Sequence, residues 1–219
     1  MISKPKILDL FCGAGGATKG LQRAGFYVVG VDNKPQPHYC GDEFHQADAL
    51  EFPLEGYDAY WASPPCQAYS QAFSQLIGKR KEPPDLVAPI RERLVATGKP
   101  FIIENVPHSP LQNYIQLDGT MFGLKVKKTR NFELHGFEIL LLPGKLPNTK
   151  GWIKDGKLVG IVQHSCYPNE KVKREHLAAA YEMDWYCTRH ELRQAIPPAY
   201  SEYLGKYLMQ EIESKAMAL

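Results

Sequence analysis

The stretch Ile7-Leu8-Asp9-Leu10-Phe11-Cys12-Gly13-Ala14-Gly15-Gly16 joins a short apolar run to three glycines. The run predicts a buried strand, and the glycines let the backbone approach a ligand where side chains would clash. We expect a helix over about residues 17–24, with Gly25 as its C-terminal stop. Residues 27–31 predict a second strand that ends at Asp32, where an acid suits the paired hydroxyls of a ribose.

Strands and helices continue to alternate along the first half of the chain. Residues 57–62 and 100–103 predict buried strands, and residues 85–97 between them predict a helix. This alternation indicates an α/β fold with a doubly wound, mostly parallel, Rossmann-like sheet, which binds ligands at the carboxyl ends of its strands. Polar or reactive residues stand at or near four of these ends: Asp9, Asp32, Cys66 and Glu104.

The pattern changes after about residue 125. Residues 152–164 indicate a hairpin that turns at Asp155-Gly156, and residues 191–216 return to helical periodicity around Pro197-Pro198. We therefore expect a cofactor-binding catalytic domain made of residues 1–125 plus 190–219, and a small β-containing appendage at 126–189.

Bulk properties exclude few functions. The chain has 219 residues and a net charge of +2, and 44% of its residues are hydrophobic, which is ordinary for a globular protein. Five cysteines without a Cys-x-x-Cys pair fit a reducing compartment and provide no zinc spacing. Neither a signal peptide nor a membrane span is expected. We predict a monomeric cytoplasmic protein without a metal and without membrane contacts.

The second informative segment is Ser63-Pro64-Pro65-Cys66-Gln67, directly after the strand expected at 57–62. Proline fixes φ and removes a backbone donor, so the pair of prolines forces the chain out of the sheet and holds Cys66 in one orientation. Rigid presentation of a thiol at a strand end is what a covalent nucleophile needs. Taken alone, a free cysteine is more often a small buried thiol.

Three segments together resemble signature motifs of the DNA cytosine-5 methyltransferases. They are, in chain order, Asp9 to Gly16, Pro64-Pro65-Cys66-Gln67 and Glu104-Asn105-Val106. Lys128-Thr129-Arg130 resembles the later Gln-x-Arg-x-Arg motif, with Lys128 at its first Arg and Arg130 at its second. The stretch from Glu191 to Gly205 is similar to the compact ending of small phage and prophage members.

The resemblance implies a specific chemistry. Cys66 would attack C6 of cytosine as a thiolate, which makes C5 nucleophilic enough to take a methyl group from S-adenosylmethionine. Glu104 would hydrogen-bond N3 and the exocyclic amine. Arg130 would anchor the O2 side and lower the pKa of the Cys66 thiol. The target base must leave the duplex stack, so base flipping is implied.

The resemblance also implies the cofactor pocket. Phe11, Gly13 and Gly15 would lie near the sulfonium, Asp32 at the ribose and Asp48 at the adenine amine. Asp48 is also placed where it could cap a turn. The full set of implied cofactor-binding residues is Asp9, Phe11, Gly13, Gly15, Asp32, Asp48 and Pro65. The helix that includes Tyr200 and Gly205 is expected to fold back and close this pocket.

Double-stranded DNA is the expected partner, with a restriction endonuclease of the same system as a further candidate, in a bacterial or phage-infected cell. The residues expected at the DNA are Gln67, Ser70, Asn105 and Lys128. The segment 67–85 carries three consecutive cations that suit phosphate contacts. The appendage mixes cations with aromatic residues, which fits groove binding, and its small size predicts a short recognition site.

Two alternatives stay open. One branch of the same family methylates transfer RNA with the same cysteine and Glu-Asn-Val residues, and a catalytically silent nucleic-acid-binding relative would retain the fold. Amino-group methyltransferases place an aromatic residue after Pro-Pro, where this chain has Cys66. A nicotinamide oxidoreductase would share the glycine loop but has no use for Pro-Pro-Cys-Gln.

Overall fold

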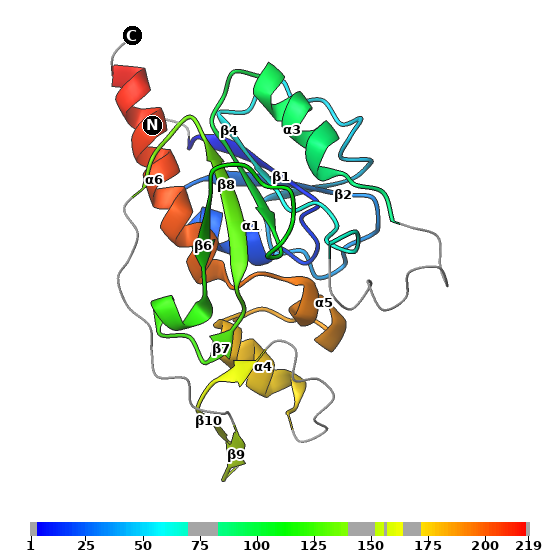
Figure 1. Ribbon diagram of the computed structural model, residues 1–219, viewed down its shortest axis with the longest axis vertical. Coiled ribbons are helices and arrows are strands. Elements are labelled where there is room, and N and C mark those ends of the chain that lie inside the picture. Colours follow the sequence, from blue (N-terminus) through cyan, green and yellow to red (C-terminus); the bar gives the residue numbers. More distant parts are fainter. Residues whose placement is uncertain (1–3, 70–82, 140–151, 156, 164–171, 218–219) are drawn as a thin grey trace.

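A seven-stranded sheet forms the centre of the molecule (Figure 1). The computed structural model describes residues 4–69, 83–139, 152–155, 157–163 and 172–217. The sheet has the order β3-β2-β1-β4-β5-β8-β6. Its strands are β1 (Lys6–Leu10), β2 (Tyr27–Asp32), β3 (Glu43–Gln46), β4 (Ala59–Ala62), β5 (Phe101–Asn105), β6 (Tyr114–Leu117) and β8 (Arg130–His135).

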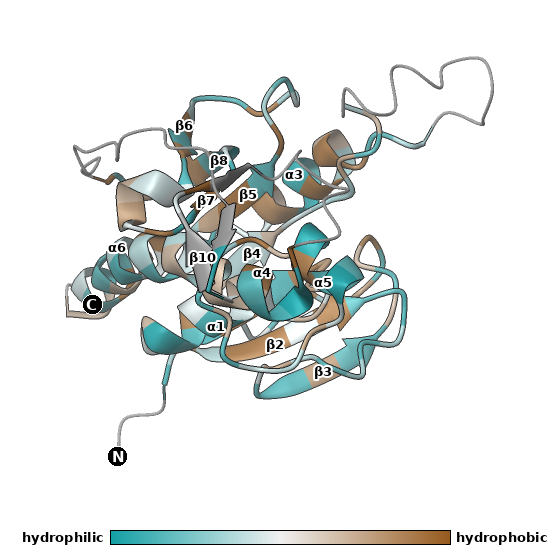
Figure 2. Ribbon diagram, turned by 90° about the horizontal axis from the view of Figure 1, so that it is seen from below, coloured by the Kyte–Doolittle hydropathy of each residue, from teal (hydrophilic) through white to brown (hydrophobic). Residues whose placement is uncertain are grey.

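Strands β1 to β5 pair in parallel, whereas β8 is antiparallel to both of its neighbours, β5 and β6. The predicted α/β fold with a mostly parallel sheet is thereby confirmed. Hydropathy distinguishes the inner strands from the edge: in Figure 2 the inner strand β2 is mostly hydrophobic and the edge strand β3 is hydrophilic. This contrast is expected, because an inner strand of a covered parallel sheet is buried on both faces.

Helices cover the two faces of the sheet. Successive residues of a strand point to opposite faces, so Ile7 of β1 belongs to one apolar cluster and Leu8 to the other. The first cluster packs against α1 (Gly16–Arg23) and α6 (Pro198–Met217). The second packs against α3 (Val87–Ala96) through Val87, Ile90 and Leu94, which recur at helical spacing. The result is a three-layer molecule whose functional residues lie at the strand ends.

The helices α1 and α6 approach each other closely at a glycine. A Cβ added at Gly20 would lie 2.1 Å from both the carbonyl oxygen of Pro198 and the hydroxyl of Ser201. No residue larger than glycine fits there unless α6 moves. The start of α6 is therefore positioned directly on the helix that follows the glycine loop.

The remaining elements lie between residues 117 and 195. They are η1 (Gly119–Phe122), β7 (Val126–Lys127), β9 (Trp152–Lys154), β10 (Lys157–Val159), β11 (Val162–Gln163), α4 (Arg174–Tyr181) and α5 (Arg189–Gln194). Strands β9 and β10 are antiparallel neighbours, which confirms the predicted hairpin. Strand β11 pairs with β7 in parallel. Helices α5 and α6 confirm the helical ending with its break before Pro198.

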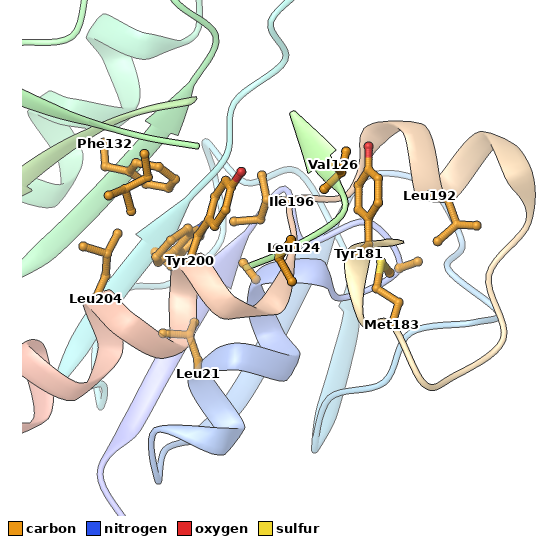
Figure 3. Packing of buried hydrophobic residues seen from close by; sticks show 14 of the residues in the cluster. Leu21, Leu124, Val126, Phe132, Tyr181, Met183, Leu192, Ile196, Tyr200 and Leu204 are labelled. Carbon is orange, nitrogen blue, oxygen red and sulfur yellow. The ribbon is translucent and has the colours of Figure 1, made fainter. Parts of the chain in front are cut away.

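The domain boundary expected at residue 126 does not coincide with a break in the fold. Strand β8 lies inside the central sheet, between β5 and β6. Its Phe132 is buried in the apolar cluster that packs against α6. Tyr181 of α4 and Leu192 of α5 belong to the same apolar cluster, and Figure 3 shows them continuing it from Leu21 and Leu204. The small hairpin β9–β10 fits the expected appendage better than the whole of 126–189 does.

No helix in the part of the chain that the structure describes combines the length and apolarity that a membrane crossing requires. Within the same residues, no cluster of three or more His, Cys, Asp or Glu side chains is arranged to hold a metal ion.

Candidate active site

The candidate site lies where the strand order of the sheet reverses, between β1 and β4. Strand β1 has β2 on one side and β4 on the other, so the loops that follow β1 and β4 diverge at the same edge. Such a switch point is where open α/β sheets bind their ligands. The loop after β1 carries the glycines of residues 13–16, and the loop after β4 carries Cys66. The two most informative sequence motifs thus occupy neighbouring loops.

The Cys66 loop is held from below by a buried amide. Asn105, at the end of β5, donates from Nδ2 to the carbonyl oxygen of Pro64 at 3.0 Å, and its Oδ1 accepts from the backbone N–H of Val106 at 2.8 Å. Pro64 is buried, whereas Cys66 is half-buried and its carbonyl accepts from the N–H of Tyr69 at 3.0 Å. The two prolines and this amide give the thiol a fixed place at the mouth of the loop.

Glu104 and Arg130 form an ion pair beside this loop. Arg130 Nε lies 3.0 Å from Glu104 Oε1, and their side chains are 11% and 9% exposed. The antiparallel pairing of β5 and β8 brings them together, because it sets the start of β8 against the end of β5. Ser63, which precedes the prolines, adds a hydrogen bond to the Glu104 carboxylate. Residues from three separate strand ends thus meet in one cluster.

Comparison with known proteins agrees with this geometry. Residues 5–112 match the family of C-5 cytosine-specific DNA methylases. This part of the chain belongs to that methylase family. The match covers β1 to β5, and therefore both the glycine loop and the Cys66 loop. Among curated proteins, none matches the sequence significantly.

Solved structures extend the likeness in fold beyond residue 112. A methyltransferase of Entamoeba histolytica, EhMeth, aligns with a TM-score of 0.59 and 13% identity over 96% of this chain and 99% of its own. A protein assigned as a prophage-encoded DNA modification methyltransferase of E. coli aligns with a TM-score of 0.44 and 22% identity over 58% of this chain. Spodoptera frugiperda DNMT2 aligns with a TM-score of 0.42 and 16% identity over 58% of this chain. This chain spans 45% and 48% of the lengths of the last two proteins.

The charges around Cys66 work against each other. Burial raises the pKa of the Cys66 thiol, Glu104 raises it further, and Arg130 and Lys128 lower it. Arg130 thus acts in the predicted direction, but burial and the carboxylate outweigh it. Burial likewise raises the pKa of Glu104, against the lowering effects of Arg130, Lys128 and the Ser63 hydrogen bond. The resting site therefore favours a thiol, and it favours a Glu104 that binds a proton more readily than usual.

Lys128 is buried rather than exposed to a nucleic acid. Its side chain is 1% exposed, and Nζ donates to the carbonyl oxygens of Arg193, at 2.9 Å, and Ala195. Tyr200, also fully buried, donates its hydroxyl to the carbonyl oxygen of Lys128 at 2.7 Å. Burial strongly lowers the pKa of the Lys128 ammonium, and neighbouring Arg130 lowers it further. The DNA contact predicted for Lys128 does not fit this placement.

Asn105 departs from its prediction in the same way. It is 1% exposed and its amide is used inside the protein, so it supports the Cys66 loop instead of contacting a substrate. Gln67 and Pro65 are exposed next to Cys66, where a substrate could reach them. Ser70 and most of the segment 67–85 lie outside the described residues.

The glycine loop has the backbone that its sequence predicts. Phe11, Gly13 and Gly15 all have positive φ, at 62°, 51° and 91°. A Cβ at Gly15 would lie 2.7 Å from the sulfur of Cys40, whereas a Cβ at Gly13 would meet nothing within 4 Å. Gly15 is therefore required by internal packing, while the space beside Gly13 is open for a ligand.

Asp9 contributes an unpaired polar atom beneath this loop. Its side chain is fully buried, Oδ2 accepts from the Thr18 hydroxyl at 2.5 Å, and Oδ1 has no hydrogen-bond partner among the residues that the structure describes. Burial raises the pKa of Asp9 to about 7, which the Thr18 hydrogen bond opposes and Asp32 reinforces. A buried acceptor without a donor is rare in native proteins. The unpaired oxygen of Asp9 fits a site that is completed by a hydrogen-bond donor, either an amino group of a bound cofactor or an ordered water.

The two other predicted acids differ in placement. Asp32, at the end of β2, is half-buried and accepts from the N–H groups of Gly13 at 3.1 Å and Lys34 at 2.9 Å. It thus joins the tip of β2 to the glycine loop, close to the site where a ribose is expected. Asp48 is exposed, and its Oδ1 accepts from the N–H of Leu50 at 2.9 Å, which is the turn-capping alternative.

The sequence analysis missed two residues that pack near the glycine loop, Tyr39 and Trp185. Trp185 donates from Nε1 to the carbonyl oxygen of Ala14 at 3.0 Å, across 171 positions of the chain. Tyr39 lies between two glycines, since a Cβ at Gly30 or Gly41 would come within 2.4 Å or 2.1 Å of its ring or hydroxyl. The glycines themselves were a possible signal for Tyr39. No local pattern could have indicated Trp185.

Proposed function

We propose that this methylase transfers a methyl group from S-adenosylmethionine to C5 of cytosine in duplex DNA through a covalent adduct between Cys66 and cytosine C6. The observation that carries the proposal is the association of Cys66, Glu104 and Arg130 at the sheet edge where the glycine loop also begins. A thiol, a buried carboxyl group and a cation are the groups that nucleophilic activation of a pyrimidine ring requires.

The reaction begins with the Cys66 thiolate adding to C6, which forms an S–C6 bond and moves an electron pair to C5. C5 then accepts the methyl group, and S-adenosylhomocysteine leaves. Water removes the proton from C5, the electrons restore the C5–C6 double bond, and the bond between Cys66 sulfur and C6 breaks. The cysteine thus returns to its starting state, and one methyl group has replaced one proton.

Glu104 and Arg130 stabilise the ring while it is attacked. Burial raises the pKa of Glu104, which favours the protonated form that donates a hydrogen bond to N3. The unprotonated oxygen accepts from the exocyclic amine. Arg130 donates to O2, and its place beside Glu104, at 3.0 Å in the free protein, limits the movement of both groups.

S-adenosylmethionine supplies an electrophilic methyl group on a sulfonium. The chain would hold it with the backbone around Phe11, Gly13 and Gly15, and with Asp32 at its ribose. Asp9 would direct its free Oδ1 toward a donor of the methionine part. Asp48 would accept a hydrogen bond from the adenine amine after the turn that its carboxylate caps has opened. The fit rests on the space beside Gly13 and on the unpaired oxygen of Asp9.

Duplex DNA as the substrate requires the target cytosine to flip out of the stack, because the thiol is half-buried in a loop below the surface. The hairpin β9–β10 and its neighbours, within the predicted recognition segment 126–189, would read the flanking bases. Gln67, which is exposed next to Cys66, would enter the space that the flipped base leaves.

The test is bisulfite sequencing of DNA from cells that express the protein, with the same treatment applied to their transfer RNA. We expect protected cytosines in one short DNA context, and none in cells that express Cys66→Ser. Protection in transfer RNA alone would replace the DNA substrate by RNA. Absence of protection in both would refute the proposed methyl transfer, provided that the wild-type protein is folded and binds S-adenosylhomocysteine.

A further inference from the structure

Lys128 links two parts of the molecule that are far apart in sequence. Its Nζ donates to the carbonyl oxygens of Arg193 and Ala195, which lie 65 and 67 residues further along the chain. The ammonium also lies 5.1 Å from the centre of the Tyr181 ring. With a side chain that is 1% exposed, Lys128 has these groups in place of water.

The carbonyl acceptors belong to the segment 193–196, which comprises the last two residues of α5 and the first two residues after it. This segment packs against the end of the glycine loop, at Gly16. A Cβ added at Gly16 would lie 2.5 Å from the carbonyl oxygen of Ile196 and 2.9 Å from the Cβ of Ala195. The segment therefore contacts Lys128 on one side and the first residue of α1 on the other. A shift of the segment would move the loop that is proposed to hold the cofactor.

Lys128 also interacts electrostatically with the cluster of Cys66, Glu104 and Arg130. Its charge lowers the pKa values of both Glu104 and Cys66, and Arg130 follows it by two residues. A positive charge on Lys128 therefore opposes the effect that burial has on the pKa values of the thiol and the carboxyl group.

Burial of an ammonium is costly unless its donors are paired. The two carbonyl acceptors and the ring of Tyr181 provide that pairing, and Figure 3 shows Tyr181, Ile196 and Tyr200 around the place where β7 ends. A lysine meant for a phosphate would need an exposed ammonium, which Lys128 lacks. Its contacts are those of a residue that positions other parts of the protein.

We propose that Lys128 is a positioning residue that holds segment 193–196 between the catalytic cluster and the glycine loop, and so makes tight cofactor binding depend on the catalytic side of the sheet. This inference rests on the proposed function, because it assumes that the glycine loop binds S-adenosylmethionine. It assigns the lysine neither to DNA nor to the reacting base.

The test compares Lys128→Met with Lys128→Arg in binding S-adenosylhomocysteine, measured by titration calorimetry on the protein without DNA. Methionine keeps the length of the side chain but removes the charge and the donors. We expect it to weaken binding about tenfold, because a charge-assisted hydrogen bond is lost. Arginine restores the charge and the donors, and we expect a dissociation constant within about threefold of the wild type. Lys127→Met, at an exposed position in β7, is the matched control and should bind like the wild type.

Two outcomes overturn the inference while leaving the proposed function intact. One is wild-type binding by folded Lys128→Met, and the other is arginine binding as weakly as methionine. Failure of the wild-type protein to bind S-adenosylhomocysteine would overturn both proposals. If Lys128→Met does not fold, deuterium exchange of the wild type decides. Ligand should slow exchange in segments 126–130 and 193–196 together, and protection restricted to the glycine loop would overturn the coupling.

Discussion

Replacing Glu104 by Gln separates the two effects that this residue has on Cys66. The carboxylate raises the pKa of the Cys66 thiol, in addition to the effect of burial. Its removal also leaves the charge of Arg130 without the partner that lies 3.0 Å away. Both changes favour the thiolate. We therefore expect Glu104→Gln to make Cys66 more reactive in the free protein while it abolishes methyl transfer.

The size of the effect follows from one unit charge in a half-buried site. At an effective dielectric constant of about 20, a unit charge near the thiol but not in contact with it contributes on the order of 2 kcal/mol, which is between one and two pKa units. The thiolate fraction at neutral pH then rises about 10- to 50-fold. Because a less basic thiolate is a weaker nucleophile, about half of this gain on a logarithmic scale is lost. The net acceleration of alkylation is about three- to tenfold.

The assay is alkylation by iodoacetamide over a range of pH, followed by mass spectrometry of the peptide that contains Cys66. Burial raises the pKa values of Cys40 and Cys187 to about 12, so these thiols react slowly and serve as internal references. Arg130→Met is the matched control, and it should slow alkylation because it removes a charge that favours the thiolate. Slower or unchanged alkylation in a folded Glu104→Gln protein would refute the electrostatic account of the site.

Three further predictions concern Asp9, Gly20 and Asp32. Burial raises the pKa of Asp9 from 3.8 to about 7, so the folded chain keeps a proton that the unfolded chain has lost, and stability falls as pH rises through this window. Asp9→Asn should remove this loss and raise the free energy of unfolding above pH 7 by up to about 4 kcal/mol, measured by urea denaturation. An unchanged pH dependence would contradict this. Gly20→Ala places a methyl group 2.1 Å from the carbonyl oxygen of Pro198 and should lower the free energy of unfolding by about 3 kcal/mol. A wild-type melting temperature would contradict the close contact between α1 and α6. Asp32→Asn removes a charged acceptor and should weaken S-adenosylhomocysteine binding about tenfold or more by calorimetry, whereas unchanged affinity would remove Asp32 from the pocket.

The positions of the main site residues could be predicted because their signals are local. The apolar run before Cys12 and the glycines after it define a strand, a turn and a helix within a few residues. Pro64-Pro65 ends β4 for a reason contained in the prolines themselves. The position of Glu104 could be predicted once β5 was expected to be parallel to β4, because its end then falls at the same edge of the sheet as Cys66.

Arg130 and Lys128 mark the limit of such prediction. They are two residues apart, yet Arg130 pairs with Glu104 whereas Lys128 turns toward carbonyl groups near residue 195. The difference depends on where α5 ends and on the close contact of α6 with Gly20, and neither is encoded near residue 128. The same limit explains why Asn105 was expected at the substrate and is found holding Pro64.

The order of strands, glycines, prolines and acids along this chain was therefore enough to define an α/β domain with Cys66 and Glu104 at the same edge of its sheet, because strand and helix periodicities are properties of neighbouring residues. Folding decided which charges share a buried space. The antiparallel entry of β8 set Arg130 against Glu104, and the return of the C-terminal helices enclosed Lys128. Burial then set the direction of the pKa shifts of Cys66 and Glu104, since the cost of a charge depends on the solvent and partners that tertiary contacts leave to it.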